Sequence, residues 1–399
     1  MRVCVTGIGC VSGIGLNVEE HLRSFRDGRD GLGAVTLFPT RHEEPVSEVK
    51  RTNEALKEQL GIPVSAALSR TALLGMTAAF EALADSGLDL SDRDRPLRVG
   101  LISSTSTGGM DLTESFYPSF RENPAQGRLR YVASHDAGDS TERISSFLGI
   151  TGFRTTVSTA CSSAANAIML GTRMIRQGML DVVAAGGTDA LCKFTLNGFA
   201  SLMILDKKPC RPFDVSRAGL NLGEGAGYLV LQSEATVGKT PYCLLSGYAN
   251  ANDAFHQTAS SSEGTGAFLA MKGALDKAGL QPEKVDYINA HGTGTPNNDA
   301  SESQAIRRLF GNRIPPFSST KAFTGHTLGA AGALEAVFSV LSLERGILYP
   351  NLNFTAPIEE TGLIPVTRYQ EGISLRSVLS NSFGFGGNNA SLLFRKYDK

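Results

Sequence analysis

The sequence has almost no net charge, no long apolar run and no cluster of basic residues. Its 38 Lys and Arg nearly balance 39 Asp and Glu, and no Lys/Arg stripe is interleaved with aromatics, which disfavours nucleic acid and anionic membranes as partners. No apolar run approaches membrane-spanning length. The opening stretch MRVCVTGIGCVSGIG lacks the charged region, apolar core and cleavage site of a signal peptide. We therefore expect a cytoplasmic protein that binds neither nucleic acid nor membrane.

Metal-binding patterns are also missing. The cysteines form no CxxC pair, and the six histidines form neither an HExxH motif nor an i, i+4 pair. A chain of 399 residues with 41% hydrophobic content can bury a large core without disulfides. We predict no metal site and reduced thiols at all six cysteines, which are Cys4, Cys10, Cys161, Cys192, Cys210 and Cys243.

Apolar β-branched runs alternate with longer amphipathic segments, a pattern typical of an α/β fold. The predicted strands are 2–9, 97–104, 181–187, 227–234, 284–292 and 377–387, and the predicted helices are 69–88, 162–178, 265–280 and 330–346. A strand-rich segment ends near residue 234 and YCLLSGYANAND then looks like a new start, which indicates two similar halves. Two further stretches, 39–63 and 111–142, are interpreted as surface excursions or lids.

Two glycine-containing stretches resemble nucleotide-binding loops but do not match them. GIGCVSG at 7–13 has Ser12 where a dinucleotide fingerprint requires its third glycine, so we interpret it as a strand-to-loop turn. VGKT at 237–240 has Ser233 where a phosphate loop requires glycine. Neither stretch therefore predicts a nucleotide site.

Cys161 lies between a short β-branched run and SSAANAI, at the expected start of a helix. Unpaired N–H groups and the helix dipole favour an anion there, so a thiolate would be stabilised and could act as a nucleophile. The competing interpretation is a buried small hydrophobe, which is the commoner fate of a free cysteine. The local sequence leaves both interpretations open.

Two other glycine-rich turns favour the interpretation of Cys161 as a nucleophile. NAHGTGTPNNDASE puts His291 at the end of a strand, and SSTKAFTGHTLGAAGALE puts Lys321 and His326 just before a helix. A hydrolase would use one histidine as a base, oriented by an acid or an amide. Two neutral imidazoles that donate N–H bonds instead suit an oxyanion that develops on a second acyl group. The pattern therefore favours condensation over hydrolysis.

Four motifs together resemble the β-ketoacyl-acyl-carrier-protein synthases of the thiolase-like superfamily. They are TACSS around Cys161, AHGTGTP around His291, STKAFTGHTLGAAGALE around Lys321 and His326, and SNSFGFGGNNAS at 380–391. The resemblance follows the family's order and covers essentially the whole chain. It implies a five-layered αβαβα fold made of two similar halves, with the cysteine in residues 1–240 and both histidines in residues 241–399. It also implies a dimer.

The resemblance further implies a role for each site residue. Cys161 would carry the acyl chain, while His291 and His326 would bind the thioester carbonyl of malonyl carrier protein and stabilise the enolate left by decarboxylation. The backbone N–H groups of Cys161 and Phe385 would hold the oxyanion of the acyl carbonyl. The remaining implied roles are Lys321 orienting the His326 region, Glu335 in the same buried network, Asp299 and Glu302 supporting the His291 loop, Thr293 and Thr295 holding phosphopantetheine, and Phe383, Phe385 and Thr107 lining or gating the substrate pocket. Phosphopantetheine arrives on the acyl carrier protein, so no bound cofactor is implied.

Departures from common family patterns narrow the resemblance. Ser158 stands where many polyketide-type members carry Asp, and GGNNAS replaces the GGTN of fatty-acid elongation enzymes. The chain looks most like the ketosynthase subunit of aryl polyene and other highly reducing type II polyketide systems, which pairs with a cysteine-lacking chain-length factor. Thr107 would give a smaller and more polar pocket wall, suited to a longer or conjugated chain.

The sequence thus predicts an acyltransferase that performs decarboxylative condensation, for an aryl polyene or related chain, as a homodimer or with a chain-length factor. The nearest alternative is fatty-acid elongation. A thiolase would be expected to carry a second, late cysteine, which SFGFGG lacks. A non-catalytic partner subunit is disfavoured by Cys161.

Overall fold

The computed structural model describes residues 1–90 and 97–398. Its strands are β1 (Val3–Ser12), β2 (Leu32–Gly33), β3 (Val46–Ser47), β4 (Val99–Ser104), β5 (Arg154–Val157), β6 (Val182–Asp189), β7 (Gly225–Ser233), β8 (Cys243–Asn252), β9 (Tyr287–Asn289), β10 (Phe317–Ser318), β11 (Ser377–Gly384) and β12 (Asn388–Lys396). Its helices are α1 (Val18–Asp27), α2 (Asn53–Gln59), α3 (Arg70–Ser86), α4 (Met110–Glu122), α5 (Ala137–Leu148), α6 (Ser163–Arg176), α7 (Lys193–Ser201), α8 (Thr265–Ala278), α9 (Pro296–Phe310), α10 (Lys321–Thr324) and α11 (Ala331–Arg345). Every predicted strand and helix is present, with bounds that differ by a few residues.

The strand order shows that the fold is duplicated. In the described part of the chain the main sheet runs β10-β9-β11-β12-β8-β1-β7-β6-β4-β5. Counting outward from the β8/β1 contact, the first half has the order β1-β7-β6-β4-β5 and the second half has the order β8-β12-β11-β9-β10. In each half the first two neighbouring pairs are antiparallel and the next two are parallel. Within the sheet, the two halves join through the residue pairs Cys4 with Leu244 and Val5 with Cys243, and each five-stranded half forms one of two sheet layers. The chain therefore contains two copies of one sheet topology.

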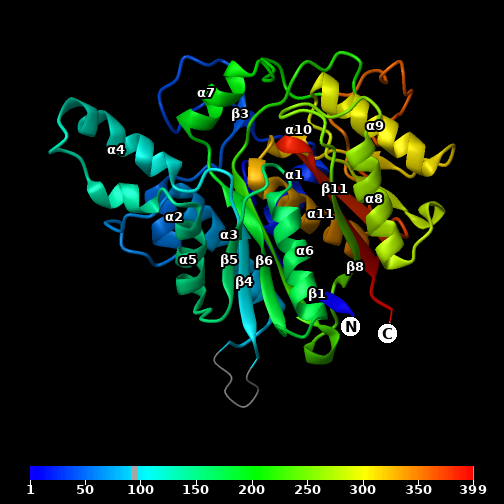
Figure 1. The fold of residues 1–399 in the computed structure, drawn as a ribbon, viewed down its shortest axis with the longest axis horizontal. Helices are drawn as coiled ribbons and strands as arrows, with labels where there is room; N and C mark the ends of the chain where they lie inside the picture. The colour runs from blue at the N-terminus through cyan, green and yellow to red at the C-terminus, as the bar shows by residue number, and fades with distance from the viewer. Residues whose placement is uncertain (91–96, 399) are drawn as a thin grey trace.

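Five layers follow from the packing of helices on these two sheets. Helix α3 covers β1, β6 and β7 from outside, and α8 covers β8 and β12 (Figure 1). Between the sheets lie α6 and α11, which contact each other and strands of both halves. A helix in the middle of a protein is apolar on all sides, and α11 is buried from Ala331 to Leu343. The structure therefore confirms the predicted thiolase-like αβαβα fold.

The GIGCVSG stretch is a strand-to-loop turn only at its last residue, Gly13, because residues 7–12 belong to β1. Gly7 and Gly9 lie inside β1, and a Cβ atom there would come within 2.1 Å of the Ala82 carbonyl oxygen and 2.2 Å of the Ala78 carbonyl oxygen in α3. The glycines thus allow α3 to pack directly on the strand backbone. VGKT follows β7 and precedes β8 rather than a helix, so it does not form a phosphate loop.

The interpretation of residues 111–142 as a surface excursion is only partly correct. Helix α4 projects from one edge of the molecule (Figure 1). Helix α5, in contrast, packs on α3, and its Ile144 is fully buried. Among residues 1–90 and 97–398, no helix has the length and apolarity needed to cross a membrane.

Candidate active site

Cys161 lies at a strand-to-helix turn between β5 and α6. Ala160, just before it, has a φ of 53°, in the left-handed region that residues other than glycine rarely adopt. The carbonyl of Ala160 accepts the N–H of Ser163, the first residue of α6. The turn therefore holds the cysteine at the helix start, as predicted, and leaves 6% of the residue exposed.

The two histidines reach the same cavity from the other half of the chain. His291 follows β9, and His326 follows the short helix α10. Their ring centroids are 5.4 Å apart, with the ring planes at 83°. Both line a cavity of about 300 Å³ together with Cys161, Phe383 and Phe385. The two histidines, 35 residues apart, are thus brought to one site with a cysteine that lies 130 residues before the first of them.

Hydrogen bonds set which nitrogen of each imidazole carries the proton. The Nδ1 atom of His326 accepts the backbone N–H of Leu328 at 3.1 Å. The Nδ1 atom of His291 lies 3.2 Å from Nζ of Lys321, whose ammonium can only donate. Burial and the nearby Lys321 charge lower the pKa of both histidines well below 6.5. Both rings are therefore neutral at physiological pH and carry the proton on Nε2.

The Lys321 side chain bonds to His291, which partly corrects the sequence expectation; Lys321 reaches the His326 region through its carbonyl oxygen, which accepts the N–H of Gly325, and through its charge. Its Nζ donates to the His291 carbonyl oxygen at 2.7 Å and to the Oε1 atom of Glu335. With Nδ1 of His291, these acceptors match the three N–H groups of an ammonium. Burial raises the pKa of Glu335 to about 7, although Lys321 opposes this rise.

The expected stabilisation of a resting thiolate is wrong. Burial raises the pKa of Cys161 to about 11, and the opposing effects of Lys321 and of the backbone N–H groups of Phe385 and Cys161 are smaller. A helix start favours an anion by only about 1 kcal/mol, whereas desolvation of a fully buried group can shift a pKa by several units. At neutral pH the protein therefore holds Cys161 as a thiol.

Two buried carboxylates fix the loop that follows His291. Glu302 accepts the N–H groups of His291 at 2.9 Å and Gly292 at 2.8 Å. Asp299 accepts the N–H of Gly294, where φ is 78°. These contacts are the ones expected of residues that support the loop.

The hydroxyls of Thr293 and Thr295 lie 2.9 Å apart and line the same cavity as Cys161. Thr295 also caps α9 by accepting the N–H of Asn298. Sequence reasoning did not identify other polar groups of this wall, which are Thr258, Ser260, Asn297 and Asn298.

A second cavity of about 340 Å³ adjoins Cys161. Apolar side chains dominate it, with Phe194, Phe199, Leu202, Leu328 and Phe385 among them. The hydroxyl of Thr107 donates to Asp189 at 2.9 Å. The Thr107 wall is therefore small, but its hydroxyl is already engaged, so it is less polar than the sequence suggested.

Phe385 lines both cavities and stacks on Phe199, with ring centroids 5.8 Å apart. Sequence reasoning missed Phe199 as a partner of Phe385. It also missed Asn388, whose side-chain oxygen accepts bonds from Ser162 and Asn166, both on or beside α6. The replacement of Thr by Asn in GGNNAS was the available signal.

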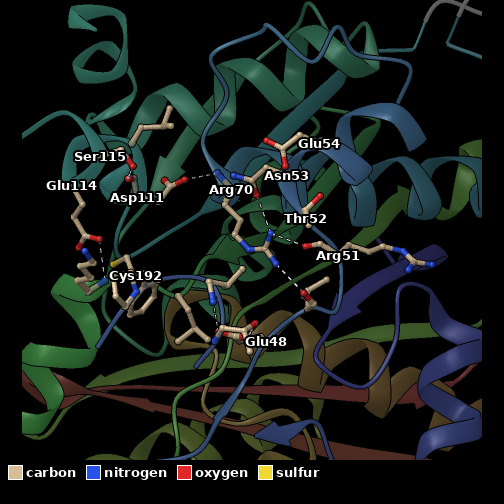
Figure 2. A pocket seen from close by; sticks show the side chains of 18 of the residues that line it. Glu48, Arg51, Thr52, Asn53, Glu54, Arg70, Asp111, Glu114, Ser115 and Cys192 are labelled. Carbon is tan, nitrogen blue, oxygen red and sulfur yellow. Dashed lines mark hydrogen bonds between the residues drawn. The ribbon is translucent and has the colours of Figure 1, made fainter. Parts of the chain in front are cut away.

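A larger cavity, of about 710 Å³, lies away from this site and shares no lining residue with the two cavities at Cys161. Figure 2 shows Arg70, Asp111 and Glu114 directed at backbone groups of neighbouring residues. Arg70 pairs with Glu224 at 2.6 Å, Asp111 accepts the N–H of Arg70, and Glu114 accepts the first N–H groups of α7. Because these groups already bond to the protein, volume alone does not identify the reactive site.

Comparison with known proteins gives the same family for both halves. Residues 1–236 match the family described as Beta-ketoacyl synthase, N-terminal domain, and residues 242–355 match Beta-ketoacyl synthase, C-terminal domain. A 3-oxoacyl-[acyl-carrier-protein] synthase 2 from Staphylococcus aureus is 33% identical over 100% of this chain and 99% of its own length.

Solved structures agree with this result. A chain of "The ishigamide ketosynthase/chain length factor" has a TM-score of 0.92 and 32% identity, over 100% of this chain and 99% of its own. A chain of "Ketosynthase (ApeO) in Complex with its Chain Length Factor (ApeC) from Xenorhabdus doucetiae" has a TM-score of 0.86 and 32% identity, over 99% and 98%. With its cysteine, two histidines and duplicated fold, the chain belongs to the β-ketoacyl synthase family and is an acyltransferase of the 3-oxoacyl-[acyl-carrier-protein] synthase type.

Proposed function

We propose that Cys161 holds an acyl chain as a thioester while His291 and His326 bind the carbonyl oxygen of a malonyl thioester. The observation that carries this assignment is the fixed protonation of both rings. Each Nδ1 is already used as an acceptor, so each neutral imidazole has only its Nε2–H left to donate. Two N–H donors beside a buried cysteine suit a developing oxyanion and cannot act as a base.

The reaction begins with acyl transfer to the cysteine. The Cys161 sulfur attacks the acyl thioester of a carrier, the new C–S bond forms, and the carrier thiolate leaves and takes up the proton lost by Cys161. The pKa of about 11 means that the free thiolate is scarce at neutral pH. Proton loss therefore accompanies attack, and the N–H groups of Cys161 and Phe385 stabilise the charge that moves onto the acyl oxygen.

Decarboxylation then supplies the carbon nucleophile. The electron pair of the malonyl C–CO₂ bond moves into the enolate, whose oxygen accepts the Nε2–H groups of His291 and His326. The enolate carbon attacks the acyl carbonyl on Cys161, the C–S bond breaks, and the thiolate takes one proton from solvent. The products are carbon dioxide, a β-ketoacyl carrier protein and the free thiol. The Phe and Gly walls exclude water, which would otherwise protonate the enolate.

The carrier's arm is proposed to enter along the threonine wall of the first cavity. Thr293 and Thr295 offer hydroxyls there for the amides of phosphopantetheine. The acyl chain would occupy the apolar second cavity, on the other side of Phe385. This division places the two thioesters on opposite sides of one aromatic ring, so that movement of Phe385 can admit the acyl chain.

We further propose an aryl polyene or related polyene product and a heterodimer with a chain-length factor. Two similar structures are described as ketosynthases together with a chain-length factor. The small Thr107 wall also suits a longer chain. Saturated fatty-acid elongation by a homodimer is the second candidate, because the Staphylococcus aureus relative is named 3-oxoacyl-[acyl-carrier-protein] synthase 2.

The residue roles are tested by separating acylation from decarboxylation. Purified protein is given malonyl-loaded carrier protein, carbon dioxide is measured, and acylation of Cys161 is followed by intact mass. His291→Ala and His326→Ala should each lower carbon dioxide release by roughly 10²–10³-fold and leave Cys161 open to acylation. Full decarboxylation by either variant would refute the oxyanion role.

Co-expression with neighbouring homologues tests the product class. A stable complex with a homologue that lacks the cysteine supports the polyene assignment. A homodimer that extends only saturated chains would overturn that assignment while leaving the condensing activity in place.

A further inference from the structure

Asp189, at the end of β6, is a buried carboxylate for which the reaction above has no role. The residue is 0% exposed, and within residues 1–90 and 97–398 no cationic side chain forms an ion pair with it. A buried carboxylate without a counter-ion must be compensated by hydrogen bonds. Its donors therefore show what Asp189 holds in place.

The donors come from two segments on either side of Asp189. From the loop after β4, Thr105, Ser106 and Thr107 each donate a hydroxyl, at 2.5, 2.5 and 2.9 Å. The backbone N–H groups of Ser106 and Thr107 donate as well, at 3.0 and 3.1 Å. From the loop after His326, the N–H of Gly329 donates at 2.7 Å. Both carboxylate oxygens accept hydrogen bonds from backbone N–H groups, so the carboxylate is held in one orientation.

These segments form two adjoining walls of the apolar cavity beside Cys161. Ser106 and Thr107 line it from the loop after β4, and Leu328, next to Gly329, lines it from the loop after His326. Leu328 has a φ of 51°, a conformation that its side chain disfavours. The Gly329 bond to Asp189 holds the backbone next to this residue.

The fit between the two walls is close. A Cβ atom at Gly329 would lie 2.8 Å from the Asp189 carboxylate and 2.8 Å from the Ser106 hydroxyl. The Gly329 N–H also donates to that hydroxyl at 2.9 Å. Glycine is therefore needed for the loop after His326 to approach the carboxylate and the Ser106 wall together.

We propose that Asp189 is a positioning residue that sets the spacing of these two walls and thereby the acyl-chain lengths that Cys161 accepts. The inference rests on the proposed acyl role of Cys161 and of the second cavity. Asp189 touches neither substrate nor sulfur, and it acts through Thr107 and Leu328. Displacement of a reacting group by about 1 Å can lower a rate by about 10²-fold.

The test compares Asp189→Asn with Asp181→Asn in the full-length protein. Asparagine has the same shape, but its NH₂ group would face N–H donors, so several bonds must break and the walls separate. Asp181 lies just before the opposite end of β6 and bonds to Arg98 near the surface, which makes it a matched control. The probes are N-acetylcysteamine thioesters with acyl chains of four, eight, twelve and sixteen carbons, and acylation of Cys161 is timed by intact mass.

Asp189→Asn should slow acylation of Cys161 by the preferred chain by roughly 10- to 100-fold. Acylation by the other chains should slow less, so the ratio of rates between chain lengths becomes smaller. Asp181→Asn should keep the wild-type profile. Iodoacetamide, which is smaller than any acyl probe, should alkylate Cys161 in the variant at least as fast as in wild type, because the Asp189 charge raises the pKa of Cys161. A merely destabilised protein would show no such contrast between reagents.

An unchanged chain-length profile in Asp189→Asn overturns the inference, as does a wild-type protein that takes all four chains at equal rates. A wild-type protein that no probe acylates at Cys161 instead overturns the proposed function. If Asp189→Asn does not fold, Thr107→Val decides, because it keeps the wall's shape and removes one hydroxyl bond. Thr107→Val should reduce the ratio between the fastest and slowest acylation rates by about threefold or more, and an unchanged ratio counts against the inference.

Discussion

Replacement of Lys321 by Met tests whether the buried lysine sets the protonation of His291. The side chain is 2% exposed and bonds to Nδ1 and the carbonyl oxygen of His291 and to Glu335. Methionine has a similar length and fills the same space without an ammonium. The substitution therefore removes three hydrogen bonds and one charge with little change in packing.

The expected loss of stability follows from Glu335. Removal of one partner of a buried ion pair costs about 3–5 kcal/mol, because the other charge stays unpaired. Glu335 already has a pKa of about 7, and without Lys321 this pKa rises further, so the carboxyl becomes protonated at pH 7. We expect a cost near the lower end, about 3 kcal/mol at pH 7.

The pH dependence of this loss has a definite sign. A carboxyl whose pKa is higher in the folded than in the unfolded state stabilises folding at low pH and loses that contribution as pH rises to the folded pKa. Below pH 7 the Glu335 carboxyl is protonated in both folded proteins. Above pH 7 only the wild type ionises it readily, so the difference in unfolding free energy should widen from pH 7 to pH 9. Denaturant unfolding at several pH values measures this difference.

Activity should fall for a different reason. Without the donor at Nδ1, the His291 ring is free to move its proton from Nε2, and one oxyanion donor is lost. Carbon dioxide release from malonyl carrier protein should drop by roughly 10²–10³-fold. Acylation of Cys161 should slow less, through the loss of the Lys321 charge that lowers the pKa of the thiol.

A second substitution separates stability from activity. In the double variant Lys321→Met/Glu335→Gln, the neutral amide replaces the unpaired carboxyl, so stability above pH 7 should recover while decarboxylation stays low. Decarboxylation by Lys321→Met within threefold of wild type would refute the reasoning. Recovery of both properties in the double variant would show that Lys321 is only structural.

Three further predictions concern other parts of the molecule. Alkylation of Cys161 by iodoacetamide should accelerate by about tenfold per pH unit from pH 7 to pH 10, because burial raises the pKa of the thiol to about 11; a plateau near pH 7 would contradict this. Gly7→Ala should lower the unfolding free energy by about 1–3 kcal/mol through contact with α3. At Gly33 an added Cβ atom would meet no heavy atom of the described residues within 4 Å, apart from its chain neighbours. Gly33→Ala should therefore change the unfolding free energy by less than about 0.5 kcal/mol in denaturant unfolding. Asn388→Ala removes the oxygen that accepts bonds from Ser162, Asn166 and Asn250, and we expect a loss of about 1–3 kcal/mol in the same assay; an unchanged midpoint would show that these bonds are dispensable.

Some features of the site follow from local sequence. Cys161 at a helix start and His291 at a strand end could be placed because hydrophobic periodicity and glycine-rich turns are short-range signals. Both positions are confirmed. The duplicated α/β fold was also predicted, since each half repeats the alternation of strands and helices and the motifs resemble one family.

Other features required the tertiary structure. GIGCVSG was misread because the signal for a turn and the signal for close helix packing are both glycine, and only the position of α3 over Gly7 distinguishes them. Lys321 was assigned to His326, its neighbour in sequence, but it contacts His291. Contacts between residues that are distant along the chain depend on how the two halves pack.

Electrostatics shows the same division. The sequence by itself determined the α/β fold class and placed Cys161 at a helix start and His291 at a strand end, because these depend on residue type and local pattern. The grouping of Cys161, His291 and His326 into one site came from the resemblance of their motifs to a known family. Only the tertiary structure decided the charge state of Cys161, the proton position on each imidazole and the hydrogen-bond partners of Asp189. Burial and distant hydrogen-bond partners set those properties, and both arise only when the layers are assembled.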